Sequence, residues 1–257
     1  FIADLVLTGG TVVTGQTRYR ADVAIKDGLI ALVGAPAAMP AARETVDVSG
    51  QFLLPGAIDV HVHFREPGYT HKEDWRTGSA AAAMGGTTTV FEMPNTEPTT
   101  TDPDALADKL RRAKGRMSCD HAFYVGGTHE NARFLGELER LPGCCGIKVF
   151  MGASTGTLLI KDDAGVEAVL SSINRRGTFH SEDEYRLEGR RPLARTGDWT
   201  SHPEVRDAES AIMSTRRLVG IAQRLGKRIH VLHVTTAEEI EFLALHKDVA
   251  SVELTPQ

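Results

Sequence analysis

The sequence predicts an α/β fold built on a parallel sheet, either open or closed into a (β/α)8 barrel. From residue 55 onward, short apolar runs typical of strands alternate with segments whose apolar residues have helical spacing. The connections between them are short, as in βα units. The chain has 257 residues, enough for one large domain or two small ones.

Residues 1–54 have a different pattern, with short strands and turns but no helical segment. The turns are Gly9-Gly10 and the hairpin-type Lys26-Asp27-Gly28. This part has few large side chains to bury and should pair with something else. We therefore expect two domains, a small β unit over residues 1–54 and an α/β unit over residues 55–257.

The α/β unit contains about seven strand-like runs: residues 57–64, 87–93, 122–125, 146–151, 177–180, 228–234 and 250–254. Thr101-Asp102-Pro103 predicts a helix start before residues 104–114, and residues 204–225 predict one long helix. A closed barrel needs eight strands. Because Gln257 follows directly after the seventh run, we expect a barrel that is incomplete at its C-terminal side.

Composition excludes several classes of protein. The formal net charge is −5, which argues against nucleic acid or an anionic membrane as a partner, and no apolar stretch approaches the ~20 residues of a membrane span. The three cysteines have no CxxC spacing, so we expect free thiols in a reducing cytoplasm. Ten histidines are more than a surface needs and suggest metal chemistry on a small-molecule substrate.

The most informative stretch is residues 57–65, because alternate residues of a strand share a face. One face is apolar and should pack on helices, with Ile58, Val60, Val62 and Phe64. The other face is polar and should line the barrel interior, with Asp59, His61, His63 and Arg65. Since the chemistry of such barrels lies at the C-terminal ends of the strands, the HxH pair predicts a metal site.

Two further histidines, His180 and His233, end later strand-like runs. His230 and His233 have opposite parity, so only one of them should face the interior, and His233 is the better ligand. Lys148 stands in an apolar strand, where an unpaired ammonium is costly. It either snorkels to water or forms a carbamate that bridges two metal ions. Four histidines and one bridging oxyanion suit two Zn2+ ions per chain.

Together these motifs resemble the dihydroorotase family of the amidohydrolase superfamily. The similarity lies in residues 59–68, in His71-Lys72-Glu73-Asp74, in residues 85–89 and 93–96, in residues 146–156 and in residues 232–236. It implies a (β/α)8 TIM barrel of the metal-dependent hydrolase type with a small β-sandwich. It also implies reversible hydrolysis of dihydroorotate to N-carbamoyl-aspartate in pyrimidine biosynthesis.

The resemblance assigns roles to individual residues. His61 and His63 would bind one zinc, His180 and His233 the other, and a carbamylated Lys148 would bridge them. Arg65 and Asn95 would hold the substrate carboxylate, and a planar guanidinium suits bidentate carboxylate binding. The family's general-base Asp lies on an eighth strand, so we expect it beyond Gln257.

Other assignments remain open from the sequence. Hydantoinase, dihydropyrimidinase and allantoinase belong to the same class, although Arg65 favours a ring that bears a carboxylate. A catalytically inert, dihydroorotase-like scaffold subunit is an alternative of another class, which the missing eighth strand favours and the complete ligand set opposes. We expect a homo-oligomer, either a dimer or a tetramer.

Overall fold

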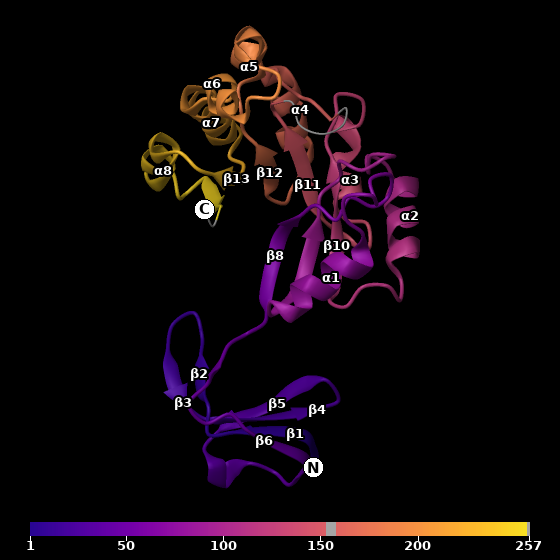
Figure 1. Cartoon of the computed structure of the whole chain (residues 1–257), viewed down its shortest axis with the longest axis vertical. Helices are drawn as coiled ribbons and strands as arrows, with labels where there is room; N and C mark the ends of the chain where they lie inside the picture. Colours follow the sequence, from indigo (N-terminus) through magenta and orange to yellow (C-terminus); the bar gives the residue numbers. More distant parts are fainter. Residues whose placement is uncertain (153–157, 256–257) are drawn as a thin grey trace. The chain divides into compact units, whose positions relative to one another are not determined.

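The computed structural model describes residues 1–152 and 158–255. It divides into two compact units, Phe1–Ala57 and Ile58–Gln257, which Figure 1 shows in indigo and in magenta to yellow. The division falls three residues after the boundary expected from the sequence. Among the described residues, no helix is both long and apolar enough to span a membrane.

The N-terminal unit consists of two small β-sheets. The first has the order β5-β4-β1-β6, with β1 (Ala3–Thr8), β4 (Asp22–Lys26), β5 (Leu29–Gly34) and β6 (Ala42–Asp47). The second has the order β3-β2-β7, with β2 (Thr11–Val13), β3 (Arg18–Arg20) and β7 (Phe52–Leu53). A short 3-10 helix, η1 (Pro36–Ala38), precedes β6.

The predicted hairpin turn and the small core of this unit are both present. Asp27 and Gly28 have positive φ angles of 51° and 77°, the backbone that a tight turn between antiparallel strands requires. Its core cluster is formed by Ala3, Val6 and Ala24, and the other buried apolar side chains are the small Ala21, Val23 and Val48. The unit therefore has little apolar burial of its own.

The second unit is built on a seven-stranded sheet, and its strands follow one another in chain order. They are β8 (Ala57–Val62), β9 (Thr87–Glu92), β10 (Asp120–Gly126), β11 (Cys144–Phe150), β12 (Gly177–His180), β13 (Ile229–Val234) and β14 (Ala250–Leu254). All neighbouring pairs from β9 to β14 are parallel. The predicted seven strands and parallel α/β architecture are confirmed.

Helices occupy the connections between these strands (Figure 1). They are α1 (Trp75–Met84), α2 (Pro103–Ala113), α3 (Leu135–Leu138), α4 (Asp163–Ser172), α5 (Glu184–Arg190), α6 (His202–Val205), α7 (Ala208–Leu225) and α8 (Ala237–Ala244), with the 3-10 turns η2 (Ala132–Phe134), η3 (Arg191–Leu193) and η4 (Trp199–Ser201). One continuous core joins the strands to the helices. The predicted start of α2 is confirmed, since the Asp102 side chain accepts from the Ala105 amide and Pro103 is the first helical residue.

The long helix predicted over residues 204–225 is wrong at its beginning. The structure has two helices there, and α7 begins only at Ala208. Asp207 interrupts the helical path because it is in an extended conformation and its side chain accepts from the Ser210 amide. It acts as an N-cap, which the apolar spacing alone did not reveal.

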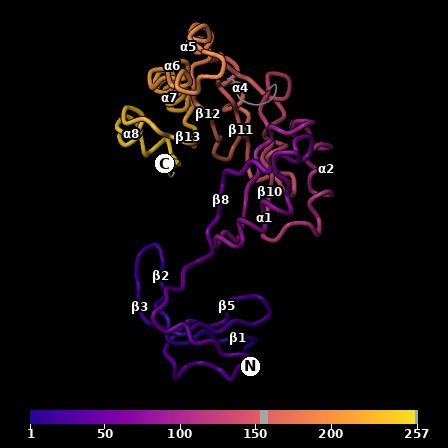
Figure 2. Tube along the Cα trace, in the orientation of Figure 1, coloured from indigo at the N-terminus to yellow at the C-terminus, as the bar shows by residue number. Residues whose placement is uncertain are grey.

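The sheet curls until its two outer strands come within side-chain contact. β8 and β14 stand at the two ends of the strand order, and Figure 2 traces the chain from β8 to its yellow C-terminal end. Nevertheless, His61 of β8 and Glu253 of β14 contact each other. The curled sheet is part of a barrel, as expected. Of the apolar residues predicted to share one face, Val62 and Phe64 join the core, but Ile58 is 59% exposed.

Candidate metal centre

The structure brings the predicted histidines together at the C-terminal side of the curled sheet. His61 lies near the end of β8, His63 follows that strand, His180 ends β12, and His233 is the penultimate residue of β13. The ring centroids of His61 and His233 are 5.6 Å apart, and those of His180 and His233 are 4.6 Å apart. Four imidazoles from three strands therefore form one cluster.

Within this cluster the ring nitrogens face each other in two pairs. His61 Nε2 lies 3.1 Å from His63 Nε2, and His180 Nδ1 lies 2.9 Å from His233 Nε2. A tetrahedral zinc with bonds of about 2.0–2.1 Å places two ligand nitrogens about 3.3–3.4 Å apart. Both pairs are within a few tenths of an ångström of that separation. Each pair therefore has the spacing of two ligands on one ion.

Burial keeps three of these imidazoles, those of His63, His180 and His233, neutral. Desolvation lowers the pKa of His63 to about 2, with the nearby positive charges adding to the effect. It lowers the pKa of His233 to about 3, and it also lowers the pKa of His180. Neutral imidazole is the form that binds metal, so these three histidines are in the ligand-competent state at pH 7.

Lys148 of β11 is the most unusual buried group. Its side chain is 1% exposed, and its Nζ has no hydrogen-bond partner among the described residues. Burial holds its pKa well below the ordinary value, although the charge of Glu253 opposes this effect. The interpretation that Lys148 snorkels to water is therefore wrong. Its charge acts on His63, His180 and His233, so Lys148 lies near both histidine pairs.

Arg65 and Asn95 present two more buried polar atoms without partners in the described chain, Arg65 Nη1 and Asn95 Oδ1. Both side chains lie close enough to His63 to influence its pKa. The strand parity predicted for Arg65 does not apply, because β8 ends at Val62 and Arg65 has a φ of 65°. A left-handed backbone, rather than strand alternation, sets the direction of Arg65.

Sequence reasoning missed two carboxylates in this cluster. Glu253 contacts His61 Nδ1, and Glu182 Oε2 lies 2.5 Å from His180 Nε2. The available sequence features were a glutamate near the C-terminal end of a short apolar strand and a glutamate two residues after a candidate ligand. Neither pattern is specific, because glutamates are common at strand ends and in loops.

The expectation that only one of His230 and His233 faces the interior is wrong. Both meet Glu253: its Oε2 lies 3.5 Å from His230 Nε2, and its Oε1 accepts from the His233 backbone amide at 3.0 Å. The register of β13 against β14 shifts between Val231 and Val234, and His233 has a φ of 39°. This irregularity cancels the strand alternation. His230 also contacts Ser251 Oγ at 2.8 Å, so it is packed behind the two pairs.

The types of donor atom in this cluster suit a pair of divalent ions, although the side chains are not already arranged around a metal position. No group of three or more His, Cys, Asp or Glu side chains in residues 1–152 and 158–255 has ready metal-holding geometry. The four histidines instead form two pairs, and the remaining donor is the unpartnered Lys148. Residues 153–156 of the stretch that resembles the family lie outside the described residues.

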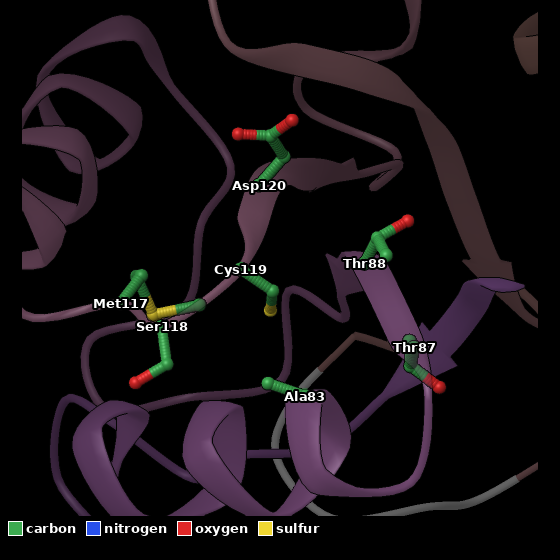
Figure 3. A pocket seen from close by; sticks show the side chains of 7 residues that line it. All are labelled: Ala83, Thr87, Thr88, Met117, Ser118, Cys119 and Asp120. Atoms are coloured by element: carbon green, nitrogen blue, oxygen red, sulfur yellow. The ribbon is translucent and has the colours of Figure 1, made fainter. Parts of the chain in front are cut away.

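A cavity of about 380 Å³ opens beside the second histidine pair. Its lining includes His180, His233, Arg206 and Thr236. Another pocket, of about 390 Å³, lies where β9 and β10 begin, at the opposite edge of a parallel sheet (Figure 3). It contains Cys119, whose pKa is raised by burial, and none of the predicted site residues. The three cysteines are free, as expected, and this pocket has no candidate chemistry.

Comparison with known proteins finds relatives of this chain. Residues 52–144 match the amidohydrolase family. A dihydroorotase from Methanosarcina mazei is 38% identical over 91% of this chain and 52% of its own length. An allantoinase from Rubrobacter xylanophilus is 36% identical over 95% of this chain and 55% of its own length. The chain thus spans about half the length of these relatives.

A solved structure provides the corresponding match in three dimensions. The L-hydantoinase (dihydropyrimidinase) from Arthrobacter aurescens superposes with a TM-score of 0.91 and 25% sequence identity, over 99% of this chain and 58% of that chain. The curled parallel sheet is therefore the fold of a known hydrolase. In sequence, residues 52–144 are similar to the amidohydrolase family, and in structure this chain is similar to 58% of a hydantoinase chain.

Proposed function

We propose that these 257 residues supply the metal-binding half of a cyclic amidohydrolase, and that its substrate is dihydroorotate. The observation that carries the proposal is the convergence of two histidine pairs around Lys148, a buried amine whose Nζ has no hydrogen-bond partner among the described residues. A buried amine in such a place needs a counter-charge or a chemical modification. Two metal ions and a carbamate meet this need together.

The residues divide naturally between two ions. His61 and His63 would hold one ion, and His180 and His233 would hold the other, with Zn2+ the best match to nitrogen and oxygen donors. When bound, such ions lower the pKa of water and polarise a carbonyl group. The chain itself keeps the imidazoles of His63, His180 and His233 neutral by burying them.

Lys148 would provide the oxygen donors as a carbamate. Its lowered pKa increases the fraction of neutral amine, and only that form attacks carbon dioxide. A bond forms between Nζ and the carbon of CO2, one proton leaves the nitrogen, and the product is an anion with two oxygens. The two metal ions would offset the negative charge of this buried anion.

Arg65 and Asn95 support a substrate that bears a carboxylate. Both offer a buried polar atom without a partner in the described residues, next to His63. A guanidinium binds a carboxylate with two charge-assisted hydrogen bonds, and dihydroorotate has a carboxylate that hydantoins lack. The relative named dihydroorotase is also slightly more similar to this chain than the one named allantoinase. This substrate would place the protein in pyrimidine biosynthesis.

The test compares substrates on the natural protein that contains these 257 residues. Purified zinc-loaded protein should hydrolyse dihydroorotate with a kcat/KM well above that for allantoin or an unsubstituted hydantoin. Faster hydrolysis of allantoin or hydantoin would overturn the substrate but not the reaction class. A protein that binds two zinc ions but hydrolyses none of these three substrates would favour the inert scaffold instead.

A further inference from the structure

We infer that Glu253 and Glu182 are positioning residues that fix opposite tautomers of His61 and His180, one in each histidine pair. The inference rests on the proposed metal centre and extends it to the groups behind the ligands. A histidine can bind metal only through a ring nitrogen that carries no proton. Whatever accepts the proton of the other nitrogen therefore decides which atom faces the ion.

Glu253 connects three strands at the first pair. Its Oε1 contacts His61 Nδ1 of β8 and accepts from the His233 amide of β13 at 3.0 Å, while Glu253 itself belongs to β14. A carboxylate can only accept, so the proton of His61 must lie on Nδ1. His61 Nε2 is then left with its lone pair, and this is the nitrogen 3.1 Å from His63 Nε2.

Glu182 acts on the second pair with the opposite result. Its Oε2 lies 2.5 Å from His180 Nε2, and its Oε1 accepts from Arg206 Nε at 2.9 Å. Arg206 Nη2 is also 3.2 Å from His180 Nε2, but a carboxylate oxygen at 2.5 Å requires a proton on that nitrogen. His180 Nδ1 then carries the lone pair, and it faces His233 Nε2 at 2.9 Å.

The two carboxylates therefore determine which ring nitrogen is free to bind an ion, namely Nε2 in His61 and Nδ1 in His180. Different parts of the structure hold these two carboxylates in place. Glu253 depends on the curl that brings β14 to β8, whereas Glu182 is only two residues from its histidine and is held by Arg206. Loss of either carboxylate should change the tautomer of its own histidine, because Glu253 contacts the second pair only through the main-chain amide of His233.

Nitrogen-15 NMR of the metal-free 257-residue chain tests the tautomers directly. His61 should be the Nδ1-H tautomer, and His180 should be the Nε2-H tautomer. Glu253→Gln should weaken the preference at His61 alone, and Glu182→Gln should weaken it at His180 alone. The matched control is Glu241→Gln, which changes an exposed glutamate of α8 and should change neither. The same tautomer at both histidines of the unaltered chain would overturn the inference, even if a variant failed to fold.

Zinc titration provides the second measurement. Loss of a supporting carboxylate typically weakens metal affinity 10–100-fold, so each variant should lose about that factor at one of two sites. Wild-type affinity at both sites in both variants would overturn the inference. If the unaltered chain bound no zinc, the proposed metal function would fail. The NMR measurement of the two tautomers would still show whether Glu253 and Glu182 position the histidines.

Discussion

His61 and Glu253 are 192 positions apart in the sequence, yet their side chains contact each other. They belong to β8 and β14, the two outer strands of a seven-stranded sheet. The contact shows that the sheet curls enough to bring its first and last strands to one site. The four histidines and Lys148 lie where that curl closes, so metal content is the first property to measure.

The chain is expected to bind close to two zinc ions. His61→Ala and His180→Ala should each remove about one ion, because the two histidines belong to different pairs. His71→Ala is the control, since His71 is exposed and belongs to neither pair. Elemental analysis after zinc-supplemented growth gives the result. A wild-type chain without metal would contradict the two-ion arrangement.

Lys148 is expected to gain the mass of one carbon dioxide when metal is bound. Lys148→Ala should remove the bridging oxygens and lower activity to background, and a short carboxylic acid should restore part of it by replacing those oxygens. Lys161→Ala is the control, because Lys161 is paired with Glu188 near the surface. Native mass spectrometry shows the adduct. An unmodified lysine in a fully metal-loaded protein would rule the carbamate out.

Arg65 is expected to determine substrate choice rather than metal affinity. Arg65→Ala removes a charge-assisted pair, at about 1.5–3 kcal/mol for each hydrogen bond. The kcat/KM for dihydroorotate should then fall on the order of 10²-fold or more. Hydrolysis of a neutral hydantoin and the zinc content should stay unchanged.

The assay for this change needs the natural protein that contains these 257 residues. Arg133→Ala, at an exposed position of η2, is the control. Equal losses of kcat/KM for dihydroorotate and for hydantoin would mean that Arg65 does not bind the substrate carboxylate.

Without metal, the protein should become less stable as the pH falls below 6.5. The pKa of His63 is lowered to about 2 and that of His233 to about 3, so below 6.5 the unfolded chain binds protons that the folded chain does not. Each histidine should then cost about 1.4 kcal/mol of unfolding free energy per pH unit. Between pH 6.5 and pH 5 the two together should cost about 4 kcal/mol.

Urea unfolding in the presence of a chelator, at pH 7 and pH 5, measures this loss. The double variant His63→Asn/His233→Asn should have a flatter dependence over the same interval. The pKa values of Glu182 and Glu253 are also lowered, but their contribution is lost only below their ordinary value of 4.5. A slope between pH 6.5 and pH 5 that the double variant retains would show that other groups cause it.

Much of the fold was predictable because local pattern determines it. The seven strand-like runs, the cap and proline at the start of α2, and the turn at Asp27-Gly28 all follow from residues close together in the sequence. The HxH parity also placed His61 toward the interior, since strand alternation is a local rule. At Arg65 this rule does not apply, because the strand has already ended and the backbone is left-handed, although Arg65 still lies near His63.

The sequence by itself determined which side chains could bind metal and on which strands they lie. Only the tertiary structure decided which of them meet. The curl of the sheet joins Glu253 to His61, an irregularity in β13 brings the His230 ring and the His233 amide to the same carboxylate, and Arg206, 24 positions further on, holds Glu182 against His180. These contacts depend on packing between segments far apart in the chain or on backbone irregularities. Neither leaves a periodic pattern, and so neither can be recognised from local spacing.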